Sequence, residues 1–155
     1  MGRFYYFAAE SNRIEGIEEV RAGEEDALYE LLLSDKICVE DLVKYVSVIQ
    51  PNAQLRATTD VPDVYVGIHH APSSGAAILE DLERLLDKIS RGAIDYHIAH
   101  IDYEKLHPFT DGNGRSGRAL WLWHRHGHAP LGFLHQFYYD TLARAQGRSD
   151  QLMGE

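Results

Sequence analysis

The segment from His107 to Arg118, HPFTDGNGRSGR, holds the densest collection of chemically useful side chains in the sequence. It lies between two stretches with helical periodicity. Gly112 and Gly114 permit backbone conformations that other residues avoid, so successive N–H groups can turn toward an anion at the start of the second helix. The helix dipole favours negative charge at that end. The segment therefore predicts a phosphate-binding loop.

The charged side chains of this loop fit the same chemistry. Arg115 and Arg118 are three residues apart, so they lie on one face of the helix and can clamp phosphate oxygens. Asp111 offers the hard oxygen ligand that Mg²⁺ takes alongside nucleotide phosphates. The imidazole of His107 can remove a proton from an attacking hydroxyl when it is neutral.

The loop has two simpler interpretations. Residues 112–117 match the dinucleotide-binding pattern GxGxxG, but they follow a helical segment and HPF instead of a strand, so the match is attributed to chance. A plain surface turn explains the glycines, yet it leaves the convergence of His107, Asp111 and two arginines without a reason.

HPFTDGNGRSGR is similar to the signature of the Fic (filamentation induced by cAMP) family, HxFx(D/E)GNGRxxR, and matches it at every specified position through Arg118. Two further segments strengthen the resemblance. VYVGIHHAP, residues 64–72, resembles the flap hairpin of the family, and FYYDTL, residues 137–142, resembles the helix that carries its nucleotide-contacting tyrosines.

The resemblance implies a protein adenylyltransferase that moves AMP from ATP to a Ser, Thr or Tyr hydroxyl of a target protein, with Mg²⁺ as cofactor. His107 would be the general base, Asp111 the Mg²⁺ ligand and Phe109 a core anchor beneath the loop. The residues expected to bind the nucleotide are Gly112, Asn113, Gly114, Arg115, Ser116, Gly117, Arg118, Tyr138 and Tyr139. The target protein is expected to dock on the flap residues Val64, Tyr65, Val66, Gly67, Ile68, His69 and His70.

SNRIEG, residues 11–16, resembles the inhibitory motif of the same family, (S/T)xxxE(G/N), in the class whose inhibitory helix precedes the catalytic core. Its defining residues here are Ser11, Glu15 and Gly16. Glu15 would pair with Arg118 and occupy the guanidinium that the ATP γ-phosphate needs, so that the α-phosphate is misdirected. The simpler interpretation is that Glu15 is a solvated helix carboxylate.

Alternative functions stay open at this stage. A relative of the family could use another phosphate-containing donor, or could remove AMP from a protein while Glu15 positions water. A catalytically idle module of the toxin–antitoxin type is a third alternative, although the intact His107 and Asp111 argue against it.

The elements that position these residues are mostly helical. Apolar residues recur at helical spacing over residues 4–20 with a break at Gly16, and over 27–32, 42–49, 78–89, 94–106, 119–126 and 133–146. The β-branched and aromatic residues of 58–70 predict a short hairpin, whose exposed edge could accept a strand from another chain. We therefore expect an all-α, Fic-type helical bundle with a short β-hairpin flap.

The chain has 155 residues, which suits one domain. We expect a single Fic domain over residues 1–147, with the inhibitory helix region in 1–22, the flap in 58–72 and the catalytic loop in 107–118. The last residues, 148–155, lose apolar periodicity and are expected to form a disordered tail.

Composition bears on partners and location. The formal net charge is −9, which disfavours broad nucleic-acid binding. Cys38 is the one cysteine, so no intrachain disulfide can form, and we expect a cytoplasmic protein in which Cys38 is buried. The sequence contains no apolar stretch approaching about 18 residues, so no membrane association is expected. Formation of a homo-oligomer is left open.

Nine histidines raise the question of a further metal site. His124, His126 and His128 are two residues apart, so on a helix they point in different directions and cannot converge on one ion unless the helix unwinds near Gly127. His97 and His100 can share a face, and we expect them to pack beside the helix of the catalytic loop.

Overall fold

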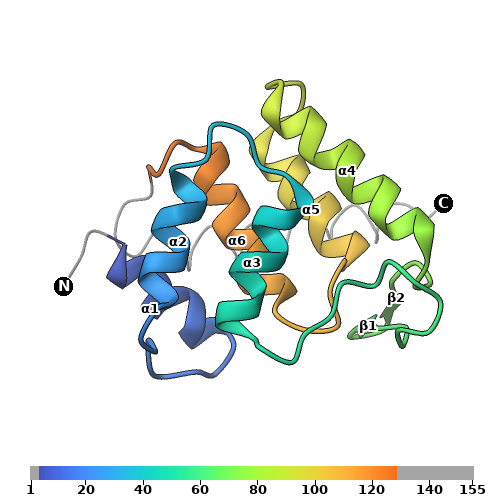
Figure 1. The fold of residues 1–155 in the computed structure, drawn as a ribbon, viewed down its shortest axis with the longest axis horizontal. Helices are drawn as coiled ribbons and strands as arrows, with labels where there is room; N and C mark the ends of the chain where they lie inside the picture. Colours follow the sequence, from blue (N-terminus) through green and yellow to red (C-terminus); the bar gives the residue numbers. More distant parts are fainter. Residues whose placement is uncertain (1–3, 129–155) are drawn as a thin grey trace, which may run out of the picture.

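The computed structural model describes residues 4–128, which form six helices and one two-stranded hairpin (Figure 1). The elements in chain order are α1 (Tyr5–Ile14), α2 (Glu24–Leu32), α3 (Val39–Ile49), β1 (Tyr65–Val66), β2 (His69–His70), α4 (Ala76–Ser90), α5 (Tyr96–Leu106) and α6 (Asn113–His124). The expectation of an all-α bundle with a short hairpin is confirmed. The expected helix over 133–146 with Tyr138 and Tyr139, and the expected tail 148–155, lie outside the described residues.

The core forms where α5 and α6 pack together, with α4 against α5 and with α2 and α3 against α6. The periodic apolar residues of α4 are all buried, which explains why a sequence rich in charged residues forms a helix there. They are Ile78, Leu82, Leu85, Leu86 and Ile89. On α6, Trp121 is 2% exposed, so the helix that begins inside the catalytic loop is anchored in the core.

Helix α1 packs on α2 and α6 and ends in a Schellman motif. Gly16 adopts a φ of 75°, its N–H donates to the Arg13 carbonyl, and the N–H of Ile17 donates to the Asn12 carbonyl. The expected break at Gly16 is therefore confirmed, whereas the expected return to helix toward residue 20 is wrong, because residues 17–20 form no helix. This ending places Glu15 directly after the last turn of α1.

The hairpin is shorter than residues 58–70 predicted. Strand β1 pairs with β2 in antiparallel register, Tyr65 with His70 and Val66 with His69. Residues 62 and 63, which precede β1, are not paired as strand residues. Pro62 has no N–H to donate to a neighbouring strand, and the Asp63 side-chain carboxylate accepts the Ser74 N–H at 2.8 Å. The hairpin lies at the far side of the molecule from α1 (Figure 1).

The expected burial of Cys38 is wrong. The residue is exposed and caps the start of α3, where its N–H donates to the Asp41 carboxylate at 2.9 Å and its thiol does so at 3.0 Å. An acidic residue three positions into a helix favours this capping arrangement. The thiol's hydrogen bond to Asp41 raises the pKa of Cys38 above its ordinary value, which lowers its reactivity.

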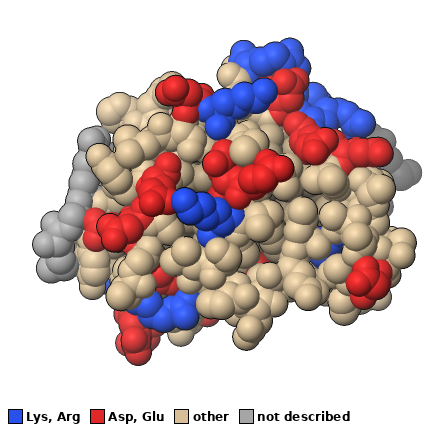
Figure 2. All heavy atoms as spheres, viewed as in Figure 1, with Lys and Arg blue, Asp and Glu red and all other residues tan. Residues whose placement is uncertain are grey.

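Acidic and basic side chains lie next to one another on the face shown in Figure 2, and no broad basic patch is visible on that face. Within residues 4–128, no helix combines the length and the apolar character that a membrane span requires.

Candidate active site

The loop between α5 and α6 is fixed by backbone pairing and by one buried ring. Phe109 is 1% exposed and forms a bridge with Leu55, which confirms the expected core anchor. The Asn113 side chain closes the loop, because its Oδ1 accepts the Phe109 N–H at 2.9 Å and its Nδ2 donates to the Phe109 carbonyl at 2.7 Å. Any part that Asn113 takes in anion binding therefore falls to its backbone N–H.

His107 stands at the junction of α5 and the loop in a left-handed conformation, with a φ of 51°. Its Nδ1 lies 3.1 Å from the carbonyl oxygen of Glu104. Since a carbonyl can only accept, Nδ1 carries the proton and Nε2 carries the lone pair. Burial lowers the pKa of His107 below the ordinary value of 6.5, so the ring is neutral at neutral pH and Nε2 can act as a base.

Helix α6 begins at Gly112, which has a φ of 77° and donates its N–H to Oδ1 of Asp111 at 2.7 Å. The next N–H groups belong to the first helical turn and have no carbonyl partner within their own helix. They border a cavity of about 460 Å³ that His107, Asp111, Glu15 and Glu104 also line. The cavity thus combines a base, a carboxylate and a helix N-terminus.

Arg118 connects this helix to the N-terminal segment. The side chain is completely buried; its Nε donates to Oγ of Ser11 at 2.8 Å, and its Nη2 donates to Oε1 of Glu15 at 2.8 Å and to the Ser11 carbonyl at 3.0 Å. Ser11 and Glu15 are four residues apart, so both reach the guanidinium from one face of α1. The structure therefore brings together the two segments that the sequence analysis singled out.

Gly114 leaves room for this contact. A Cβ atom at Gly114 would collide with Oε1 of Glu15 and would lie 3.0 Å from Nη1 of Arg118. The glycine of the loop thus gives the Glu15 carboxylate access to α6.

Arg115 lines the cavity, but its guanidinium is directed to the end of α3. It donates to the Ile49 carbonyl at 3.1 Å and to the side-chain oxygen of Gln50 at 2.7 Å, and Glu24 lies 3.9 Å away. In this conformation Arg115 joins α6 to α3, and its expected contact with phosphate stays a prediction.

Ser116 and Gly117 lie where α6 packs on α5. The Ser116 hydroxyl is 2.7 Å from the Tyr103 hydroxyl and donates to the Gly112 carbonyl at 2.8 Å. A Cβ atom at Gly117 would lie 2.9 Å from the Tyr103 ring. Both residues therefore serve helix packing here, and their expected nucleotide contacts stay predictions. His100 packs beside α6 as expected, with Nδ1 3.4 Å from the Gly117 carbonyl.

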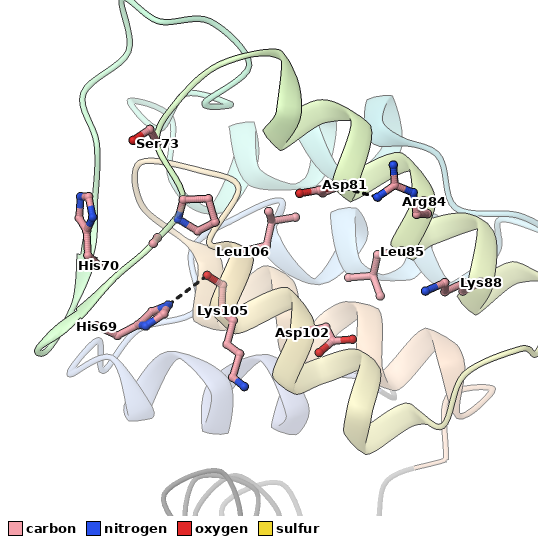
Figure 3. A pocket seen from close by; sticks show the side chains of 12 residues that line it. His69, His70, Ser73, Asp81, Arg84, Leu85, Lys88, Asp102, Lys105 and Leu106 are labelled. Carbon is pink, nitrogen blue, oxygen red and sulfur yellow. Dashed lines mark hydrogen bonds and ion pairs between the residues drawn. The ribbon is translucent and has the colours of Figure 1, made fainter. Parts of the chain in front are cut away.

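The flap borders a second cavity of about 570 Å³ between the hairpin, α4 and α5 (Figure 3). Leu85 and Leu106 line it among charged side chains, and Nε2 of His69 lies 3.4 Å from the Lys105 carbonyl. At the hairpin turn Ile68 is fully exposed, so an apolar side chain stands in solvent.

Arg56 is a positioning residue that no sequence pattern marked. The buried guanidinium donates to the carbonyls of Leu106 at 2.8 Å and His107 at 2.7 Å, and also to the Pro72 carbonyl at 2.7 Å and the Ser74 hydroxyl at 3.1 Å. It therefore joins the backbone of the candidate base to the end of the flap.

Glu104 was also missed, although its spacing carried a signal. It lies four residues after His100, so the two share one face of α5, and it precedes His107 by three residues at the end of that helix. The structure places its carboxyl in the cavity that His107 lines.

Comparison with known proteins adds one finding. A model of the Fic/DOC family matches residues 36–124, which include the hairpin, the loop and all of α6. No curated protein and no solved structure matches the chain. The match starts after α1, so the inhibitory class of the N-terminal segment stays a prediction.

The substitution Arg56→Lys is expected to lower the free energy of unfolding by about 2–4 kcal/mol, because lysine cannot reach the four acceptors and leaves buried carbonyls unpaired. Urea denaturation measures the change. Arg84→Lys is the matched control: its side chain is 65% exposed and paired with Asp81, so a change within about 0.5 kcal/mol is expected. Equal effects at the two positions would contradict the role given to Arg56.

Proposed function

Because the chain belongs to the Fic/DOC family, we propose that it is a protein adenylyltransferase that transfers AMP from ATP to a Ser, Thr or Tyr hydroxyl of a target protein. The observation that carries the proposal is the cavity lined by His107, Asp111 and the N-terminus of α6. Each of these groups suits one requirement of the reaction.

In the proposed reaction Nε2 of His107 takes the proton of the target hydroxyl while its oxygen bonds to the α-phosphorus of ATP. The bond from that phosphorus to the bridging oxygen breaks, and pyrophosphate leaves. The first N–H groups of α6 bind phosphate oxygens, so positive partial charge faces the charge that develops on them. The fixed loop supplies orientation, which contributes much of the catalysis in phosphoryl transfer.

The residues present fit Mg²⁺ as cofactor. Asp111 is an exposed carboxylate at the cavity, beside the helix N-terminus that would bind phosphates. Within the described part of the chain no group of three or more His, Cys, Asp or Glu side chains could hold a metal. An ion held by Asp111, water and phosphates suits Mg²⁺, which would neutralise phosphate charge.

The resting protein is proposed to be slow because Glu15 and Ser11 occupy Arg118. A carboxylate and a terminal phosphate compete for the same guanidinium, and the carboxylate is already held at 2.8 Å. ATP could then bind without the alignment that in-line attack at the α-phosphorus needs.

The target protein is proposed to dock on the flap hairpin. Strands β1 and β2 pair with one another, so each keeps an outer edge whose backbone groups can add a strand from a partner. The exposed side chains of Tyr65 and Ile68 supply apolar contacts beside that edge.

Intact-mass analysis after incubation with ATP and Mg²⁺ tests the proposal. Glu15→Gly is expected to gain one or more AMP units by self-modification at a rate at least about tenfold above the original protein, because Arg118 is released. Glu15→Gly combined with His107→Ala is expected to gain none, because the base is lost.

Glu18→Gly is the matched control, since this exposed carboxylate lies outside α1 and is expected to leave the rate unchanged. Unchanged or lower activity in a folded Glu15→Gly variant would reject the inhibitory role. A mass gain that persists without His107 would reject the assigned base. ATP binding without any mass gain would favour another donor or the removal of AMP, in which Glu15 could position water in the same cavity.

The pH dependence of the Glu15→Gly variant provides a second test. His107 must be neutral to act as base, and burial holds its pKa below 6.5. The value of kcat/KM is therefore expected to be insensitive to His107 ionisation above pH 6.5, and to fall by about tenfold per pH unit below the lowered pKa. Circular dichroism over the same range controls for unfolding. An acid limb centred above 6.5 would contradict this assignment.

A further inference from the structure

Glu104 carries a half-buried carboxyl group for which the proposed mechanism has no role. Its side chain is 19% exposed and lines the same cavity as Glu15 and His107. Its Oε1 is buried and has no hydrogen-bond partner among the described residues. A buried polar atom at the edge of a candidate site calls for a ligand or a proton.

Groups on three helices face this carboxyl. From α5, Nε2 of His100 lies 3.9 Å from Oε1, which is too long for a hydrogen bond. Burial lowers the pKa of His100 to about 4, so that ring is neutral. From α6, a Cβ atom at Gly117 would lie 2.7 Å from Oε1, so the glycine makes room for the carboxyl.

The remaining charged neighbours are Arg118 on α6 and Glu15 at the end of α1. Tyr103 on α5 and His107, which directly follows α5, are uncharged at neutral pH. Arg118 favours the ionised form of Glu104, and Glu15 disfavours it. Arg118 is already paired with Glu15 at 2.8 Å. Burial therefore prevails and raises the pKa of Glu104 to about 8, so the carboxyl keeps its proton at neutral pH.

We propose that Glu104 is a nucleotide-binding residue that holds a proton and donates it in a hydrogen bond to an oxygen of the terminal phosphates bound at Arg118. The proposal rests on the proposed function, because it assumes that phosphates replace Glu15 at that guanidinium. Binding of the phosphates makes or breaks no covalent bond when Glu104 is already protonated. When Glu104 is ionised before binding, its carboxylate takes one proton from the solvent and forms the O–H bond.

If Glu104 donates a proton to the bound phosphates, ATP binding and proton uptake by the protein are coupled, and this uptake can be measured. Replacing the single charge of Glu15 by phosphate charge raises the pKa of Glu104 further in the complex. Below the free protein's pKa of about 8 the carboxyl is already protonated, and binding takes up no proton there. Above it, binding must take up a proton, so the affinity falls by up to about tenfold per pH unit.

Isothermal titration calorimetry of the Glu15→Gly variant with ATP and Mg²⁺ tests the proposal. Titrations at about pH 9 in two buffers of different ionisation enthalpy count the protons taken up on binding. In the free Glu15→Gly variant the charge that disfavours ionised Glu104 is gone, whereas Arg118, which favours it, remains. Phosphate charge bound at Arg118 then raises the pKa of Glu104, so this variant is expected to take up close to one proton per ATP at that pH. The double variant Glu15→Gly, Glu104→Gln keeps a neutral donor of the same shape, so it is expected to take up none and to bind ATP with unchanged affinity between neutral and alkaline pH.

AMP is the control ligand, because it lacks the terminal phosphates and is expected to bind without this proton uptake. Equal proton uptake by ATP in the two variants would overturn the proposal, and so would equal uptake with AMP and ATP. Absence of ATP binding in both variants would reject the proposed function together with this inference. ATP binding without AMP transfer would reject the transferase alone, because the calorimetric comparison still decides the role of Glu104.

Discussion

The buried guanidinium of Arg56 is the constraint on which the geometry of the candidate site depends. A guanidinium removed from water must find acceptors for its N–H groups, and here they include the carbonyls of Leu106 at the end of α5, of His107 and of Pro72 at the end of the flap. The hydrogen bonds of this one cation therefore hold two backbone segments, at Leu106–His107 and at Pro72, against the segment of Arg56 itself. The left-handed conformation of His107 persists because its carbonyl is held in this way.

Arg118 is the second completely buried arginine of the site, and its partners are of a different kind. Arg56 is held mainly by backbone carbonyls, which cannot leave without unfolding the loop. Arg118 is held by one carbonyl, one hydroxyl and the Glu15 carboxylate, which is part of a side chain at a helix end. One guanidinium thus stabilises a permanent geometry, while the other binds an anion that a ligand can replace.

Much of this arrangement was predictable from patterns that depend on spacing. The apolar period of α4, the buried anchor Phe109 and the pairing of Glu15 with Arg118 all appear in the structure as expected. Arg56 was not predictable, because its partners are mainly backbone atoms that carry no sequence signal. The short length of the hairpin strands was also not predictable, because β-branched and aromatic residues do not show where a side-chain hydrogen bond, such as that of Asp63, takes the place of strand pairing. Cys38 was expected to be buried because cysteine is usually an apolar core residue, and its position as the residue that caps α3 was not considered.

The left-handed turn at Gly16 ends α1 immediately after Glu15, so this carboxylate lies at the negative end of a helix dipole. A negative charge there is disfavoured by about 0.3–1 kcal/mol where it is solvent-exposed. The attraction of Arg118 opposes a repulsion that α1 itself exerts. The dipole of α1 therefore weakens the net binding of Glu15 to Arg118 in the resting protein. An incoming phosphate competes with a carboxylate whose charge α1 already disfavours.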